Sequence, residues 1–192
     1  MRLLGFSGAI HSYEPGSAAF ALLEAHASSD ELWYVHNVAL GEIAERRNLH
    51  LSRDSVASSL LRVTEAHVKA EPKSRAVSDE LVQVCRLDDC LVTEMGERLW
   101  LKLDTQGFEA SILAGAVRAL RSSVVVQCEL SILPCYEDQA DYRYLIGLLH
   151  GNGFDLCWVE PGTQDRVTGQ LLQFDGIWAR EEVMEPRLWT EL

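Results

Sequence analysis

Two carboxylates, Asp104 and Glu129, each close an apolar run that is predicted to be a buried strand. The run 99–104 (LWLKLD) ends on Asp104, and the run 124–129 (VVVQCE) ends on Glu129. Because burial makes ionisation costly unless a partner is near, two such groups converging on one cleft suit three tasks: binding an ammonium group, holding a divalent metal, or accepting a proton from a hydroxyl. Taken singly, each carboxylate can equally cap the next helix or pair with a basic side chain such as Lys102.

A third carboxylate, Glu14, ends an earlier strand candidate in the segment SYEP. In nucleotide-binding α/β units, an acid at the end of the second strand accepts hydrogen bonds from both ribose hydroxyls. The alternative is an exposed carboxylate beside a helix start, where the helix dipole already favours it. The position of Glu14 leaves both interpretations open.

Apolar strand candidates alternate with amphipathic helix candidates along the chain, which predicts an α/β fold with a largely parallel sheet covered on both faces. The predicted strands span 9–13, 34–40, 82–87, 99–104, 124–129, 155–159 and 171–179. The predicted helices span 17–27, 59–70, 109–121 and 140–150. Ser17 is expected to cap the first helix. Since ligands of such sheets bind at the carboxyl ends of the strands, Asp104, Thr105 and Gln106 are expected to lie at the site.

The length of 192 residues predicts one domain, residues 1–192, with a sizeable core. We expect 46–53 and 71–80 to be surface excursions within it. The formal net charge of −12 argues against a nucleic-acid backbone or an anionic membrane as the main partner. No segment approaches the ~20 apolar residues that span a bilayer, and the first residues lack the apolar run of a secretory signal. These features predict a cytoplasmic protein and leave its oligomeric state open.

The cysteines and histidines predict no site of their own. The five cysteines, Cys85, Cys90, Cys128, Cys135 and Cys157, are odd in number and form no CxxC pair, which indicates buried free thiols. The six histidines show no metal-ligand spacing, and the chain contains no GxSxG or Walker motif. We therefore expect no metal site built on histidine.

Several blocks carry a resemblance to a known family. The most specific are KLDTQGFE (102–109) and LLQFDGIWAR (171–180), accompanied by SYEPGSAAFALLEAHA (12–27), HNVALGE (36–42) and VVVQCELSILPCYE (124–137). Taken in order, these blocks resemble the FkbM family of S-adenosylmethionine-dependent methyltransferases. The resemblance implies a Rossmann-like class I methyltransferase sheet, mostly parallel with an antiparallel last strand. It also implies methyl transfer to a hydroxyl of a small molecule such as a sugar or a polyketide-type metabolite.

The resemblance also implies residue roles. Glu14 would hold the ribose of the cofactor, and Asn37 would approach the adenosine. Asp104 would lie beside the methionine end of the cofactor and the acceptor, and Glu129 would line the acceptor side. Methyl transfer requires that the acceptor oxygen be aligned and relieved of its proton, a role for Asp104 with or without a divalent metal.

One part of the family pattern has no counterpart here. Family members begin with a strand, a glycine-rich turn and a helix, whereas this chain opens with MRLLGFSGAIHSYEP. That turn supplies a close backbone approach to the cofactor, so we expect this chain to bind S-adenosylmethionine weakly. The alternative is a truncated, non-catalytic methyltransferase-like module for binding or dimerisation. A nucleotide-binding oxidoreductase is disfavoured because no GxGxxG is present.

Overall fold

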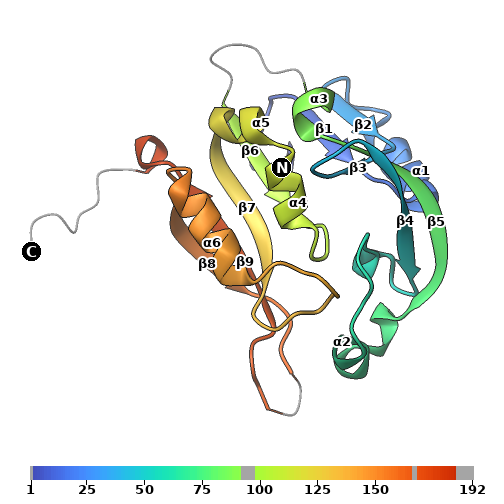
Figure 1. Cartoon of the computed structure of the whole chain (residues 1–192). Coiled ribbons are helices and arrows are strands. Elements are labelled where there is room, and N and C mark those ends of the chain that lie inside the picture. Colours follow the sequence, from blue (N-terminus) through green and yellow to red (C-terminus); the bar gives the residue numbers. More distant parts are fainter. Residues whose placement is uncertain (1, 92–97, 166–167, 185–192) are drawn as a thin grey trace, which may run out of the picture.

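Strands and helices are interspersed along the chain in a mixed α/β fold. A computed structural model describes residues 2–91, 98–165 and 168–184 (Figure 1). The strands are β1 Ile10–Tyr13, β2 Trp33–His36, β3 Ala39–Leu40, β4 Glu45–Ser52, β5 Ala76–Cys85, β6 Leu99–Leu103, β7 Ser123–Ser131, β8 Asp155–Pro161 and β9 Gln173–Ala179. The α-helices are α1 Ser17–Ala27, α2 Glu65–Ala70, α3 Leu87–Cys90, α4 Glu109–Ala114, α5 Val117–Ser122 and α6 Tyr142–Gly151. Short 3-10 turns occupy Arg2–Leu4, Ser55–Ala57, Pro72–Ser74 and Glu181–Val183.

The described strands form three sheets rather than one. Their orders are β1-β2, β3-β5-β4 and β6-β7-β9-β8. The pairs β1–β2, β3–β5 and β6–β7 are parallel, whereas β4–β5, β7–β9 and β8–β9 are antiparallel. The expected antiparallel last strand is confirmed, but the expectation of a single, mostly parallel sheet is wrong. The predicted strand 34–40 is divided at Asn37, because β2 and β3 pair in different sheets.

The strand β4 lies where a surface excursion was expected. It pairs with β5 from Glu45 opposite Val84 to Ser52 opposite Ala76. Its sequence ERRNLHLS carries few apolar residues, so its own pattern did not predict a strand. Only Leu49, 4% exposed, is fully buried, which shows that pairing with β5 determines this segment.

Two of the predicted helices differ from the observed ones. The predicted helix 59–70 is shortened to α2, whose N-cap Thr64 accepts a hydrogen bond from the His67 backbone N–H. The predicted helix 109–121 is divided into α4 and α5 at Gly115. The division has a tertiary cause, because the buried Asp88 carboxylate accepts hydrogen bonds from the Arg118 and Ala119 backbone N–H groups.

The start of α1 also differs from the prediction. Gly16 rather than Ser17 is the N-cap, so the N-cap residue has no side chain that could accept a hydrogen bond. The backbone N–H of Ser17 donates instead to the Glu80 carboxylate of β5. A distant acid therefore stabilises the N-terminus of α1.

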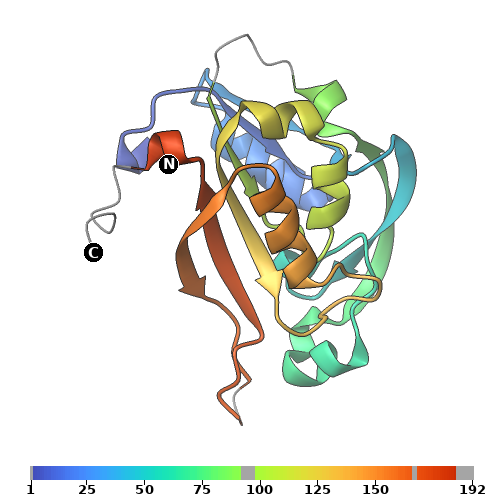
Figure 2. The ribbon, with the colours of Figure 1, turned by 60° about the vertical axis from the view of Figure 1, so that its left-hand side comes forward.

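Helices α4, α5 and α6 cover one face of the four-stranded sheet, and α4 also lies against the β3-β5-β4 sheet (Figures 1 and 2). Val126, Leu130 and Trp178 are fully buried on the covered face. The opposite face carries Trp100 and Trp158, which are 51% and 62% exposed. The expectation that helices cover both faces is therefore wrong for this sheet.

Two of the five cysteines are bonded to each other. Cys85, at the end of β5, and Cys90, in α3, form a disulfide, so the expectation of five free thiols is wrong for this pair. Cys128 and Cys135 are free and buried, as expected, whereas Cys157 is free and exposed. Within the described ranges, no helix has the length and apolar character needed to cross a membrane.

Candidate functional site

Asp104 and Glu129 lie at the same edge of the four-stranded sheet. The parallel strands β6 and β7 place Leu103 opposite Cys128, so Asp104, which directly follows β6, comes beside Glu129, which lies near the end of β7. The prediction that these strands are adjacent and parallel is confirmed. An apolar strand that ends in an acid, followed by a helical crossover to another such strand, brings both acids to one edge.

Gln106 connects the two carboxylates. Its Nε2 donates to Asp104 Oδ1 at 3.2 Å and to Glu129 Oε2 at 3.1 Å. The Tyr136 hydroxyl donates to Gln106 Oε1 at 2.9 Å. Sequence reasoning placed Gln106 at the strand end but did not predict this bridge, since a glutamine after a strand carries no signal for it.

Glu129 is an acid with a raised proton affinity at this edge. A second amide, Gln173 Nε2, donates to the same Oε2 at 3.0 Å. Burial, followed by the negative charges of Asp104, Glu109 and Asp175, raises the pKa of Glu129 to about 7. A carboxylate with this pKa suits a general base at neutral pH.

Carboxylates extend across the sheet from Glu129. Asp175 on β9 lies directly opposite Glu129 on one side and opposite Glu160 of β8 on the other. Like charges directly opposite each other in a sheet destabilise it. Of these neighbours, Asp175 contributes to the raised pKa of Glu129.

Asp104 is more exposed than Glu129, and both of its carboxylate oxygens accept hydrogen bonds. Its Oδ2 accepts a hydrogen bond from Lys102 Nζ at 2.9 Å, and its side chain is 49% exposed. Both of its oxygens therefore have partners, Lys102 and Gln106. The pairing with Lys102 that the sequence left open is present.

Glu109, at the start of α4, is buried beneath the turn that carries Gln106. It is 1% exposed, and its Oε1 accepts hydrogen bonds from the backbone N–H groups of Thr105 and Gly107 and from the Thr105 hydroxyl. Its Oε2 is buried without a hydrogen-bond partner in the described part of the chain. Burial raises the pKa of Glu109 despite those hydrogen bonds. The sequence indicated only a helix start at this position.

A pocket of about 280 Å³ lies between this sheet edge and the segment that carries α2. Asp104, Gln106 and Glu129 line one wall, and His67 and Lys73 line the other. Burial lowers the pKa of His67, so its ring is neutral at pH 7 and can donate or accept a hydrogen bond. Sequence reasoning did not single out His67, because nothing local distinguishes it from the other histidines.

Glu14 and Asn37 lie together at the ends of β1 and β2. Asn37 Nδ2 donates to the backbone carbonyl of Glu14 at 2.9 Å, and Glu14 Oε1 accepts from the Gly16 N–H at 2.8 Å. Burial and the neighbouring Glu80 raise the pKa of Glu14. The structure thus brings the four predicted residues together as two pairs, Glu14 with Asn37 and Asp104 with Glu129, in different sheets.

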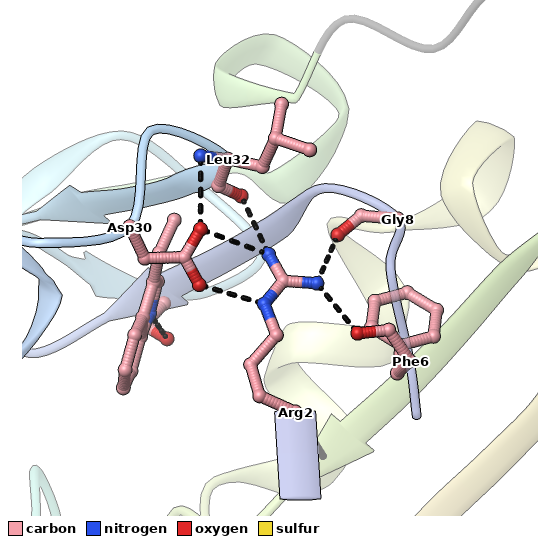
Figure 3. A network of polar contacts seen from close by, with 7 residues as sticks. Arg2, Phe6, Gly8, Asp30 and Leu32 are labelled. Carbon is pink, nitrogen blue, oxygen red and sulfur yellow. Dashed lines mark hydrogen bonds and ion pairs between the residues drawn. The ribbon is translucent and has the colours of Figure 1, made fainter. Parts of the chain in front are cut away.

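A wider hollow of about 670 Å³ lies beside the N-terminal segment and is a poor candidate for chemistry. Arg2 dominates it and binds Asp30 through two nitrogens, at 2.6 and 3.2 Å (Figure 3). The remaining guanidinium hydrogens reach the carbonyls of Phe6, Gly8 and Leu32. These hydrogen bonds occupy the N–H donors of the guanidinium with groups of the same chain. They also connect the segment before β1 to the residues just before β2.

No group of three or more His, Cys, Asp or Glu side chains within residues 2–91, 98–165 and 168–184 has an arrangement that suits a metal ion. His11 and His36 instead stack on each other, with ring centroids 5.5 Å apart, and form the 3.3 Å contact between Nδ1 of His11 and Nε2 of His36. His50 lies 2.6 Å from Asp79 Oδ1.

Comparison with known proteins indicates a family. The methyltransferase FkbM domain matches residues 1–156 of the chain. The crystal structure of methyltransferase FkbM from Methylobacillus flagellatus KT is similar, with a TM-score of 0.50 and 15% sequence identity. The similarity covers 88% of this chain but only 36% of that protein, so the chain spans about a third of its length. No curated protein matches the chain. At this identity the structural likeness concerns the fold alone.

Proposed function

The chain belongs to the FkbM methyltransferase family, and we propose that it is an S-adenosylmethionine-dependent O-methyltransferase with a Rossmann-like class I core. The acceptor in this proposal is a hydroxyl of a small molecule such as a sugar or a polyketide-type metabolite. The observation that carries the proposal is Glu129, a carboxylate with a pKa of about 7 that lines the pocket. Deprotonation of a hydroxyl as it is methylated needs such a base.

Glu129 is a better proton acceptor than Asp104 in this arrangement. Within the described residues, Glu129 Oε2 takes both amide bonds, from Gln106 and Gln173, and no hydrogen bond reaches Oε1. Both oxygens of Asp104 already accept hydrogen bonds. We therefore assign the proton to Glu129 Oε1 and give Asp104 a role in orienting Gln106 and the acceptor.

Glu14 suits the ribose of S-adenosylmethionine because its carboxylate oxygens accept hydrogen bonds. Its Oε1 accepts from Gly16, while no hydrogen bond to Oε2 occurs among the described residues, which leaves an oxygen for a ribose hydroxyl. Asn37 lies beside it and would face the adenosine, and Asp104 would face the methionine end. When bound, the cofactor would supply an electrophilic methyl group.

The second wall of the pocket contributes polar contacts for the acceptor. His67 is neutral, and Lys73 is a cation within the same pocket. A hydroxyl-rich acceptor can therefore hydrogen-bond to His67 while one of its hydroxyls lies at Glu129. Holding the acceptor between two walls in this way lowers the entropic cost of the reaction.

The proposal is tested by following backbone amide NMR signals during a titration with S-adenosylhomocysteine into the millimolar range. We expect shifts at Gly16, Asn37 and the 104–107 turn. Glu14→Ala should weaken binding by roughly 10–100-fold, the loss of hydrogen bonds to a charged group. Glu24→Ala, an exposed carboxylate of α1, is the matched control and should bind as the wild type does.

Methyl transfer itself is measured with isotopically labelled S-adenosylmethionine and a panel of monosaccharides and hydroxylated polyketides. Glu129→Gln should lower the rate by roughly 100-fold or more, the usual contribution of a general base. Glu160→Gln, an exposed acid of the same sheet, should leave the rate unchanged. An absence of S-adenosylhomocysteine binding at millimolar concentration, or transfer by Glu129→Gln at the wild-type rate, would refute the proposal.

A further inference from the structure

Gln106 has an unusual backbone conformation for a residue other than glycine. Its φ is +54°, in the left-handed region, and Gly107 follows with φ +95°. A left-handed conformation is unfavourable at a non-glycine residue and persists only when its surroundings require it. The buried Glu109 carboxylate supplies that requirement by binding the N–H groups on both sides of Gln106, and the Ser59 hydroxyl donates to the Gln106 carbonyl at 2.7 Å.

The side chain of Gln106 is as constrained as its backbone. A primary amide has two hydrogens, and here one is donated to Asp104 and the other to Glu129. The Tyr136 hydroxyl, which also lies 3.2 Å from the Ala57 carbonyl, donates to the amide oxygen. The reverse orientation would place the amide oxygen against two carboxylates, so electrostatics fix the direction of the amide.

This constraint determines which oxygen of Glu129 is available. Gln106 and Gln173 both donate to Oε2, from a loop after β6 and from β9 respectively. We infer that Gln106 is a positioning residue that occupies Glu129 Oε2 and so directs Oε1 to the acceptor hydroxyl in the pocket. The inference deepens the proposed function and rests on it for the identity of the proton that Glu129 receives.

The hydrogen bond from Gln106 changes the pKa of Glu129 in the opposite direction to the surrounding negative charges. The titratable groups that influence or are influenced by Glu129 are Asp104 after β6, Glu109 on α4, Asp175 on β9, Cys128 on β7, and Cys135 and Tyr136 after β7. Across the pocket lie Asp54, His67, Glu71 and Lys73. Burial and the surrounding acids raise the pKa of Glu129, whereas the hydrogen bond from Gln106 lowers it. Removal of the amide should therefore make Glu129 a stronger base that is protonated at higher pH.

The experiment measures the pKa of Glu129 directly, by NMR titration of the full chain labelled with ¹³C in the glutamate carboxyl groups. Gln106→Met removes the amide at similar length. Gln106→Gly removes the side chain but tolerates the left-handed backbone, so it serves if Gln106→Met fails to fold. In both variants we expect the pKa of Glu129 to rise by roughly 0.5–1 unit, and in Gln106→Glu by more.

The matched control is Gln127→Met, two residues before Glu129 on the same strand and the same face of the sheet. It should leave the pKa of Glu129 unchanged. If Glu129 titrates at the wild-type pH in folded Gln106→Met and Gln106→Gly, or if Gln127→Met shifts it equally, the inference is wrong. A shift without any methyl transfer by the wild type would uphold the positioning role and refute the proposed function. If the wild type transfers methyl groups and the pH profile of transfer is the same in the Gln106 variants, the proposed function is upheld and the positioning role is refuted.

Discussion

The substitution Glu129→Gln should stabilise the protein at neutral and alkaline pH but not in acid. The pKa of Glu129 is about 7 in the folded protein, compared with an ordinary value of 4.5. Below pH 4.5 the Glu129 carboxyl is protonated in both the folded and the unfolded chain, so it does not lower the free energy of unfolding. Between pH 4.5 and 7 the unfolded chain releases the proton first, and the folded state loses stability as pH rises. One pKa unit corresponds to 1.36 kcal/mol, so the full shift is worth about 3 kcal/mol above pH 7.

Glutamine at position 129 has the same shape and no charge. Its side-chain oxygen can still accept the amide bonds of Gln106 and Gln173, so packing at the sheet edge should be preserved. The free energy of unfolding of Glu129→Gln should therefore match the wild type at pH 4 and exceed it by about 2–3 kcal/mol at pH 8. The expected gain reflects the charge alone.

Urea unfolding followed by circular dichroism at pH 4, 6 and 8 measures this difference. Glu160→Gln is the matched control, because Glu160 lies opposite the same Asp175 but on the exposed edge strand β8. Its stability should stay within about 0.5 kcal/mol of the wild type at each pH. A stability difference for Glu129→Gln that is equal at pH 4 and pH 8 would refute the assignment of a raised pKa to Glu129.

The remaining predictions concern three positions in the helices around the site. A Cβ at Gly115 would lie 2.0 Å from the Gly41 carbonyl oxygen, so Gly115→Ala should lower the free energy of unfolding by about 2–3 kcal/mol in chemical denaturation. Gly147, in α6, has open space around it, and Gly147→Ala should stabilise by about 0.5–1 kcal/mol. Asp88→Ala leaves the first N–H groups of α5 without their acceptor and should cost about 2 kcal/mol, measured by thermal unfolding, whereas Asp88→Asn should cost less.

The placement of the acid pair was predictable from sequence. Asp104 and Glu129 each end an apolar run, and the segment between them has the length of a helical crossover. Such crossovers join parallel strands, so both acids had to reach one edge of the sheet, as the pairing of β6 with β7 confirms. The ordered blocks around KLDTQGFE also predicted the family, because family motifs survive in the linear sequence.

Other features depend on residues that are distant in the chain. The segment ERRNLHLS carries little apolar signal and becomes β4 only because β5 provides hydrogen-bond partners along its length. The periodicity of 109–121 is continuous, yet the helix divides at Gly115, where Gly41 approaches too closely for any side chain and Asp88 binds the N–H groups of α5. Neither partner lies within the segment it reshapes.

The chemistry of the site was decided in the same way. The residue types Asp104 and Glu129 were readable from sequence, but the raised pKa of Glu129 was not. Partial burial and the charges of Asp104, Glu109 and Asp175 raise this pKa, while the amide hydrogen bonds to Oε2 come from Gln106 and Gln173, which lie 23 and 44 residues away. Sequence patterns record which groups are present at strand ends, whereas burial and charge depend on distances that only the folded chain sets.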